Sequence, residues 1–138
     1  MKLYISILIF SIAGIFGNTK SSEVNIENDK EDIISSCLVQ LISKGLKISD
    51  TEGRRYLDCT VYFVENGYLE STIEPKLIGE KVCILDPNVL FQIEIDTYLE
   101  ISNFKIYPDS AEIDIQFYPS ENEYHFKLSK KQKLWMVH

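Results

Sequence analysis

Residues 98–128 read YLEISNFKIYPDSAEIDIQFYPSENEYHFKL, and apolar residues alternate with polar ones through most of this segment. Successive side chains of a β-strand point to opposite faces, so a two-residue period predicts strands with one apolar face and one polar face. The alternation of apolar and polar residues shifts by one position near Asn103, which indicates a β-bulge. Pro108 and Asp109 predict one turn, and residues 119–123 predict the next. The segment therefore predicts three antiparallel strands covered on one face.

Shorter strands are predicted on either side of this segment. Residues 56–64 alternate in the same way, with Leu57, Cys59, Val61 and Phe63 on the apolar phase and Asp58, Thr60 and Tyr62 on the polar phase. Residues 81–85 predict a short strand. Residues 68–80 contain Pro and Gly and predict a loop, with a short edge strand within it as the alternative. Residues 133–137 predict the last strand, with Trp135 closing the core.

The hydrophobic period changes upstream of Gly45. Two neighbouring rows of apolar residues at four-residue spacing indicate an amphipathic helix: Ile33, Cys37 and Leu41, and beside them Ile34, Leu38 and Ile42. Asn28 is a suitable N-cap, Glu31 completes a capping box, and Gly45 is a suitable stop. One helix followed by antiparallel strands predicts an α+β fold, with the N-terminal helix packed on a curved, mainly antiparallel β-sheet.

The first 17 residues are predicted to be a signal peptide. Lys2 precedes an apolar run from Leu3 to Phe16, whose 14 residues would span about 21 Å as a helix. This is short of the ~30 Å of a bilayer core and typical of a secretory signal. Residues 18–27 are then a flexible linker and residues 28–138 a single α+β domain. An uncleaved anchor, or a first helix of the domain, remains the alternative.

These boundaries predict an exported protein, periplasmic or extracellular, with no stable membrane insertion after signal cleavage. The formal net charge is -7, and removing residues 1–17, which contain Lys2 and no acid, leaves -8. A field of that sign repels phosphate backbones, so nucleic acid is not expected as a partner. The same field would attract a basic partner.

The chain has three cysteines and no CxxC pair. Cys37 lies on the apolar stripe of the predicted helix, where a buried packing role is expected. Cys59 and Cys83 lie on neighbouring predicted strands and can form a disulfide in an oxidising compartment, although spacing alone leaves the bridge open. The only histidines, His125 and His138, have no predicted pairing with a cysteine that would make a nucleophile.

The polar phase of the strands defines a candidate interaction surface. Tyr62 and Tyr118 fall on that phase, and a sheet face that exposes tyrosines is suited to recognition. Glu112 and Asp114 share one face because they are two residues apart. Two such carboxylates permit acid–base hydrolysis, but a solvated sheet face produces the same spacing.

No phosphate-binding glycine motif, zinc-ligand spacing or nucleophile elbow occurs in the sequence. We therefore predict no catalytic, cofactor-binding or metal-binding residues, and a protein that is not an enzyme.

The order of elements, with the signal-like start and the final segment YHFKLSKKQKLWMVH (residues 124–138), resembles the NTF2-like and cystatin-like α+β rolls. It also resembles small exported proteins of unknown function from Bacteroidetes. The chain has one predicted helix where NTF2-like domains begin with two or three. The resemblance implies a curved sheet whose concave face can form a pocket for an unspecified ligand.

The leading functional hypothesis is an exported, non-enzymatic domain that binds a protein or a small ligand through its sheet face or concavity. One alternative is an acidic inhibitor or immunity-type protein directed at a basic exported protein, because the mature chain is strongly negative. A second alternative is a hydrolase that uses the paired carboxylates.

Overall fold

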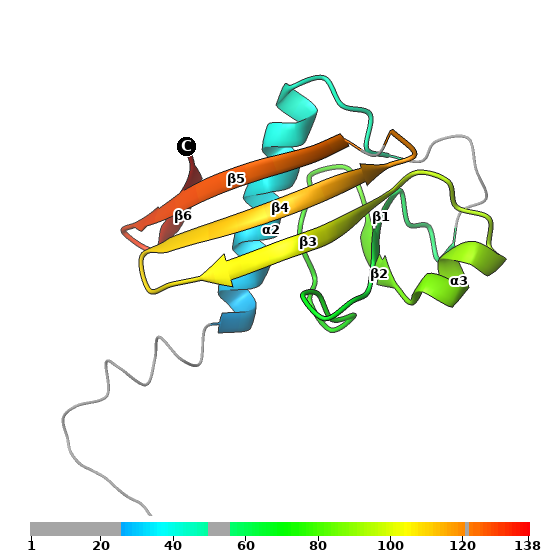
Figure 1. Ribbon diagram of the computed structural model, residues 1–138, viewed down its shortest axis with the longest axis horizontal. Helices are drawn as coiled ribbons and strands as arrows, with labels where there is room; N and C mark the ends of the chain where they lie inside the picture. The colour runs from blue at the N-terminus through cyan, green and yellow to red at the C-terminus, as the bar shows by residue number, and fades with distance from the viewer. Residues whose placement is uncertain (1–25, 50–55, 121) are drawn as a thin grey trace, which may run out of the picture.

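A computed structural model describes residues 26–49, 56–120 and 122–138. Its elements, in chain order, are α2 (Ile26–Ser43), β1 (Val61–Val64), β2 (Val82–Leu85), α3 (Pro87–Gln92), β3 (Tyr98–Ile106), β4 (Ser110–Tyr118), β5 (Asn122–Lys131) and β6 (Leu134–Val137) (Figure 1). The predicted signal peptide and most of the predicted linker lie outside the described residues. In the described part of the chain, no helix has the length and apolar character needed to cross a membrane.

The described strands form one curled, six-stranded sheet in the order β2-β1-β3-β4-β5-β6. Strand β1 is parallel to both of its neighbours, and the pairs from β3 to β6 are antiparallel. Helix α2 crosses behind β3, β4 and β5, whereas β1, β2 and α3 lie at the other end of the sheet (Figure 1). The predicted α+β fold, with one N-terminal helix on a curved sheet, is confirmed, and its sheet is mixed.

The main core lies between α2 and the sheet. The helix contributes Ile33, Ile34, Cys37, Leu38 and Leu41, all fully buried. The sheet contributes the apolar phase of each long strand, including Ile101, Ile113, Ile115, Phe126 and Leu128. The alternation predicted along residues 98–128 therefore matches the face that α2 covers.

Helix α2 includes Ile26 and Glu27, which were predicted to belong to the linker. Asn28 consequently lies within the first turn, and its predicted role as N-cap is wrong. The acidic Glu27 and Asp29 favour this longer helix, because negative side chains are stabilised near the positive end of the helix dipole.

The predicted bulge is present. The pairing of β3 with β4 shifts register between Ile101 and Asn103. After the shift, Phe104 pairs with Ile113 and packs, partly buried, against the main core. The bulge thus returns the apolar side chains at the end of β3 to the face that α2 covers.

A second, smaller core lies on the opposite side of β1, under α3. It consists of Cys59, Tyr62, Val64, Leu90 and Ile95. Tyr62 is 1% exposed, so its predicted place on an exposed surface is wrong. The physical reason is that β1 is an interior strand: β2 and β3 flank it, and both of its faces are covered.

Two local differences from the predicted elements accompany this second core. Residues 56–60 do not form a strand: the chain turns at residues 56–58, where Leu57 and Asp58 have positive φ angles of 52° and 61°. Helix α3 was not predicted: the Asp86 side chain accepts a hydrogen bond from Asn88 N at 2.8 Å and caps the helix, and Pro87 starts it. Asp86 and Pro87, which were predicted only to end the preceding strand, therefore also begin α3.

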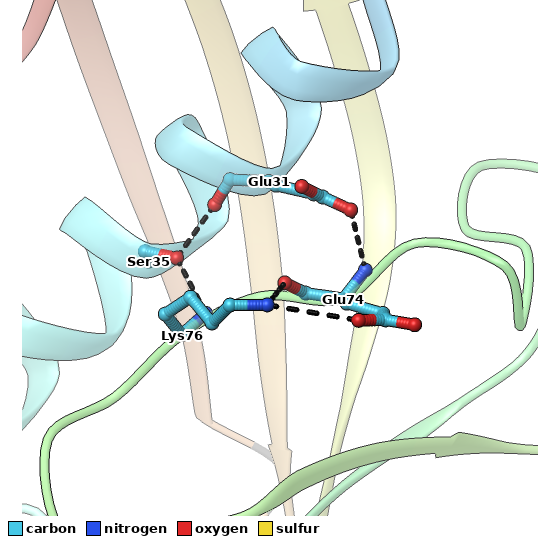
Figure 2. Close-up of polar contacts among 4 residues, drawn as sticks. All are labelled: Glu31, Ser35, Glu74 and Lys76. Atoms are coloured by element: carbon cyan, nitrogen blue, oxygen red, sulfur yellow. Dashed lines mark hydrogen bonds and ion pairs between the residues drawn. The ribbon is translucent and has the colours of Figure 1, made fainter.

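The predicted loop between β1 and β2 is held against α2 (Figure 2). Glu74 N donates to Glu31 Oε2 and Lys76 N donates to Ser35 Oγ, each over 2.8 Å. Ser35 Oγ in turn donates to Glu31 O over 2.6 Å. Side chains on one face of α2 thus satisfy backbone donors of a segment without regular structure, and this fixes the loop beside the helix.

Candidate functional site

The residues predicted to form an interaction surface do not come together. Tyr62 is in the second core. Tyr118 lies at the end of β4, where its ring stacks on Tyr98 with centroids 4.7 Å apart and its hydroxyl bonds Glu100 Oε1 over 3.2 Å. Glu112 and Asp114 lie further back along β4, on the face opposite α2.

The two predicted carboxylates have basic neighbours across the sheet. Glu112 pairs in register with Lys105 on one side and Lys127 on the other. Asp114 Oδ1 contacts His125 Nδ1, the residue paired with it on β5. Neither carboxylate belongs to the lining of three grooves in the described part of the chain. The two carboxylates therefore lie beside basic residues of the neighbouring strands.

The cysteines occupy two different environments. Cys59 and Cys83 form a disulfide with their Cα atoms 5.9 Å apart, which joins the turn before β1 to β2. Cys37 is a free thiol in the main core, and burial raises its pKa to about 12. Across the described ranges, no three His, Cys, Asp or Glu side chains are grouped closely enough to hold a metal ion.

A groove of about 480 Å³ opens where the first turn of α2 meets the end of β3. We call it the α2 groove. Its apolar lining comes from segments far apart in the sequence: Ile26, Tyr68, Phe104, Ile106, Tyr107 and Pro108. Because the bulge turns Phe104 and Ile106 toward the helix side, they form its floor where α2 no longer covers the strand.

Three apolar side chains around the α2 groove remain exposed to solvent. The exposed fractions are 49% for Ile26, 41% for Tyr68 and 50% for Tyr107. The loop anchored to α2 carries Tyr68, and the turn after β3 carries Tyr107. Within the described residues, neither tyrosine hydroxyl has a hydrogen-bond partner. The groove is thus an apolar surface with two hydroxyl groups near its edge.

The charged groups that line the α2 groove are paired. Asp29 Oδ1 accepts from Lys130 Nζ over 3.2 Å and from Trp135 Nε1 over 3.1 Å. The same Lys130 Nζ lies 5.6 Å from the centre of the Trp135 ring. Lys30 Nζ lies 3.9 Å from Glu70 Oε1. Each charge in the lining therefore has an opposite charge beside it.

Asp32 lies one turn further along α2, and its pKa reflects its burial and the negative charge of the neighbouring acids. Its pKa is raised by burial first and then by repulsion from Asp29 and Glu31, while Lys130 acts in the opposite direction. Lys130, which contacts Asp29 directly, therefore also offsets part of the negative charge around Asp32.

Sequence reasoning did not find the α2 groove. Ile26 was assigned to a linker, Phe104 and Ile106 belonged to a predicted strand, and nothing local connects them to Tyr68 or Tyr107. Only the topology brings the start of α2, the long loop and the end of β3 to one place. Comparison of the chain with protein-family models, with curated proteins and with solved structures gives no match.

Proposed function

We propose that the chain is an exported, non-enzymatic binding domain, and that its α2 groove receives the neutral, apolar part of a small ligand. The observation that carries this proposal is the set of three exposed apolar side chains, Ile26, Tyr68 and Tyr107, around a groove without unpaired charge. Removing apolar surface from water contributes roughly 25 cal/mol per Å², so covering these side chains favours binding.

The size and charge of the α2 groove support a neutral occupant. A volume of about 480 Å³ lies in the range of small-molecule sites. A charged ligand would lose hydration and meet Asp29, Lys30 and Lys130 already engaged with their own partners. The hydroxyl groups of Tyr68 and Tyr107 can each form one hydrogen bond that orients a polar edge of the ligand.

Export is supported by two features. The start of the chain combines Lys2 with the apolar run from Leu3 to Phe16, as secretory signals do. The disulfide between Cys59 and Cys83 is compatible with an oxidising compartment.

The proposed binding is tested with Nile red, a neutral apolar dye whose emission shifts to the blue in apolar surroundings. We expect saturable binding to the full chain. Gly67 lines the α2 groove, and a Cβ built on it meets no atom within 4 Å, so Gly67→Leu should fill the groove without a backbone clash. We expect Gly67→Leu and Tyr107→Ser each to weaken dye binding about tenfold, equivalent to ~1.4 kcal/mol.

Ile78→Ser is the matched control, because Ile78 is fully exposed and outside the α2 groove. The control should bind Nile red as the unmodified chain does. Equal affinity for all four proteins, or a loss as large in Ile78→Ser, would contradict the proposal. Urea unfolding of each variant establishes that the fold is retained.

A further inference from the structure

A second groove of about 480 Å³ lies between α3, the start of β3 and the end of β4. We call it the α3 groove. Its lining includes Leu90, Phe91, Ile95, Asp96, Tyr118 and Pro119. None of these residues belongs to the α2 groove, so the two sites can be altered independently.

Phe91 is the most exposed aromatic side chain described in the chain, at 84%. Its neighbour Leu90 is 4% exposed and belongs to the second core, so the helix face that anchors α3 leaves Phe91 in solvent. The cap by Asp86 and the disulfide beside the second core fix this support. An aromatic group held on a rigid element is typical of the residues that dominate protein–protein binding.

The segment that surrounds the α3 groove is acidic, and its acids have no salt-bridge partner among the described residues. The sequence from Val82 to Phe104 includes four acids and no Lys or Arg: Asp86, Glu94, Asp96 and Glu100. Over the described ranges, none of these four forms a salt bridge. By contrast, Asp29 and Asp114 elsewhere each contact a basic side chain. In the described part of the chain, negative charge without a salt bridge is therefore concentrated in the segment that carries the exposed phenyl ring.

We propose that the α3 groove docks a basic segment of a partner protein, with an apolar side chain of that segment against Phe91 and its Lys or Arg residues facing Glu94 and Asp96. Charge complementarity selects this occupant. A second copy of the same chain carries a net charge of -7 and is repelled over long range. If the chain is an acidic inhibitor of a basic protein, the α3 groove is the surface that would bind that protein. It is separate from the ligand site in the α2 groove.

The test uses a fluorescein-labelled synthetic peptide of alternating Lys and Leu, with a Glu and Leu peptide of the same length for comparison. Anisotropy of the labelled peptide is measured while the full chain is titrated in, at low and at raised salt. We expect the Lys peptide to bind, the Glu peptide not to bind, and raised salt to weaken binding. Phe91→Ser should weaken binding about tenfold or more.

Charge and position are tested with further variants. The double variant Glu94→Gln, Asp96→Asn should weaken binding and reduce its dependence on salt. The controls are Met136→Ser, which removes an exposed apolar side chain from β6, and Glu112→Gln, which removes a carboxylate from the middle of the sheet. Both controls should bind as the unmodified chain does. Equal losses in the controls, or self-association of the chain that Phe91→Ser abolishes, would overturn the proposal.

Discussion

Trp135 Nε1 donates a hydrogen bond to Asp29 Oδ1 over 3.1 Å and thereby joins the last strand to the first turn of α2. Trp135 is 7% exposed, and Lys130 Nζ reaches the same carboxylate oxygen from the end of β5. One aspartate thus satisfies an indole donor and an ammonium group at the edge of the α2 groove. The contact links the end of the described chain to its beginning.

Asp29→Ala should lower the free energy of unfolding by about 1–3 kcal/mol, because it leaves the Trp135 indole and Lys130 without their shared acceptor. The measurement is urea unfolding followed by the fluorescence of Trp135, the only tryptophan in the chain. Glu27→Ala is the matched control, since Glu27 is in the same helical turn. Equal effects of the two substitutions would show that helix charge, and not this contact, matters.

Tyr62→Phe should destabilise the second core by about 1–3 kcal/mol. The Tyr62 hydroxyl donates to Cys59 O over 2.9 Å and accepts from Tyr56 N over 3.1 Å, so the variant leaves two backbone groups unpaired. Tyr68→Phe removes a hydroxyl near the edge of the α2 groove and should change stability by less than ~0.5 kcal/mol. If both variants unfolded at the same urea concentration, the described role of Tyr62 would be wrong.

Replacing both Cys59 and Cys83 by Ala should lower stability by about 3 kcal/mol, because their bridge closes a loop with a sequence separation of 24. Urea unfolding with and without a reducing agent provides the measurement. The reducing agent should destabilise the unmodified chain and leave the double variant unchanged. A chain whose unfolding midpoint is insensitive to reduction would contradict the bridge.

Stability should fall at alkaline pH because of Cys37. Burial raises the pKa of this thiol from its ordinary value of 9.0 to about 12. Below pH 9 the thiol is protonated in both states and contributes no pH dependence, whereas at higher pH only the unfolded chain loses the proton. The free energy of unfolding then falls by up to about 1.4 kcal/mol per pH unit, and this continues until the folded thiol titrates.

Cys37→Ala isolates that contribution, because all other alkaline titrations are shared with the unmodified chain. The difference in stability between the two proteins should shrink as the pH rises from about 8 to 10. Parallel pH profiles would show that the thiol is not buried in the way described. Alkylation by iodoacetamide offers a second measurement, in which Cys37 should react only after unfolding.

The elements with a sustained period could be predicted from the sequence. Strand β4 alternates without interruption from Ala111 to Phe117, and α2 carries five buried residues at helical spacing. Even the bulge near Asn103 was visible, because one strand must insert a residue to keep its apolar side chains on one face. In these segments local pattern and tertiary burial agree.

The region between residues 56 and 97 was predicted less well, because its strand β1 is buried on both of its faces. Strand β1 reads VYFV, and the tyrosine looked like an outward position in an alternating strand. The strand is parallel to both neighbours and buried on both faces, a situation in which alternation carries no information. Helix α3 has only six residues, too few to establish a helical period.

Neither groove could be predicted from local pattern. The α2 groove requires Ile26, Tyr68 and Tyr107 to meet, and these residues are separated by about 40 positions each. The α3 groove depends on which of two adjacent apolar residues, Leu90 or Phe91, packs inward. The one sequence signal that was available is the absence of Lys and Arg from residues 82–104.

The most direct test of ligand binding in the α2 groove is a methyl NMR titration of isoleucine-labelled chain with Nile red. Ile26 and Ile106 line the α2 groove, whereas Ile34 is buried in the main core and Ile95 lines the α3 groove. We predict saturable shifts of the Ile26 and Ile106 methyl signals with little change at Ile34 and Ile95. Unchanged Ile26 and Ile106 signals, or shifts confined to Ile95, would contradict the proposed site.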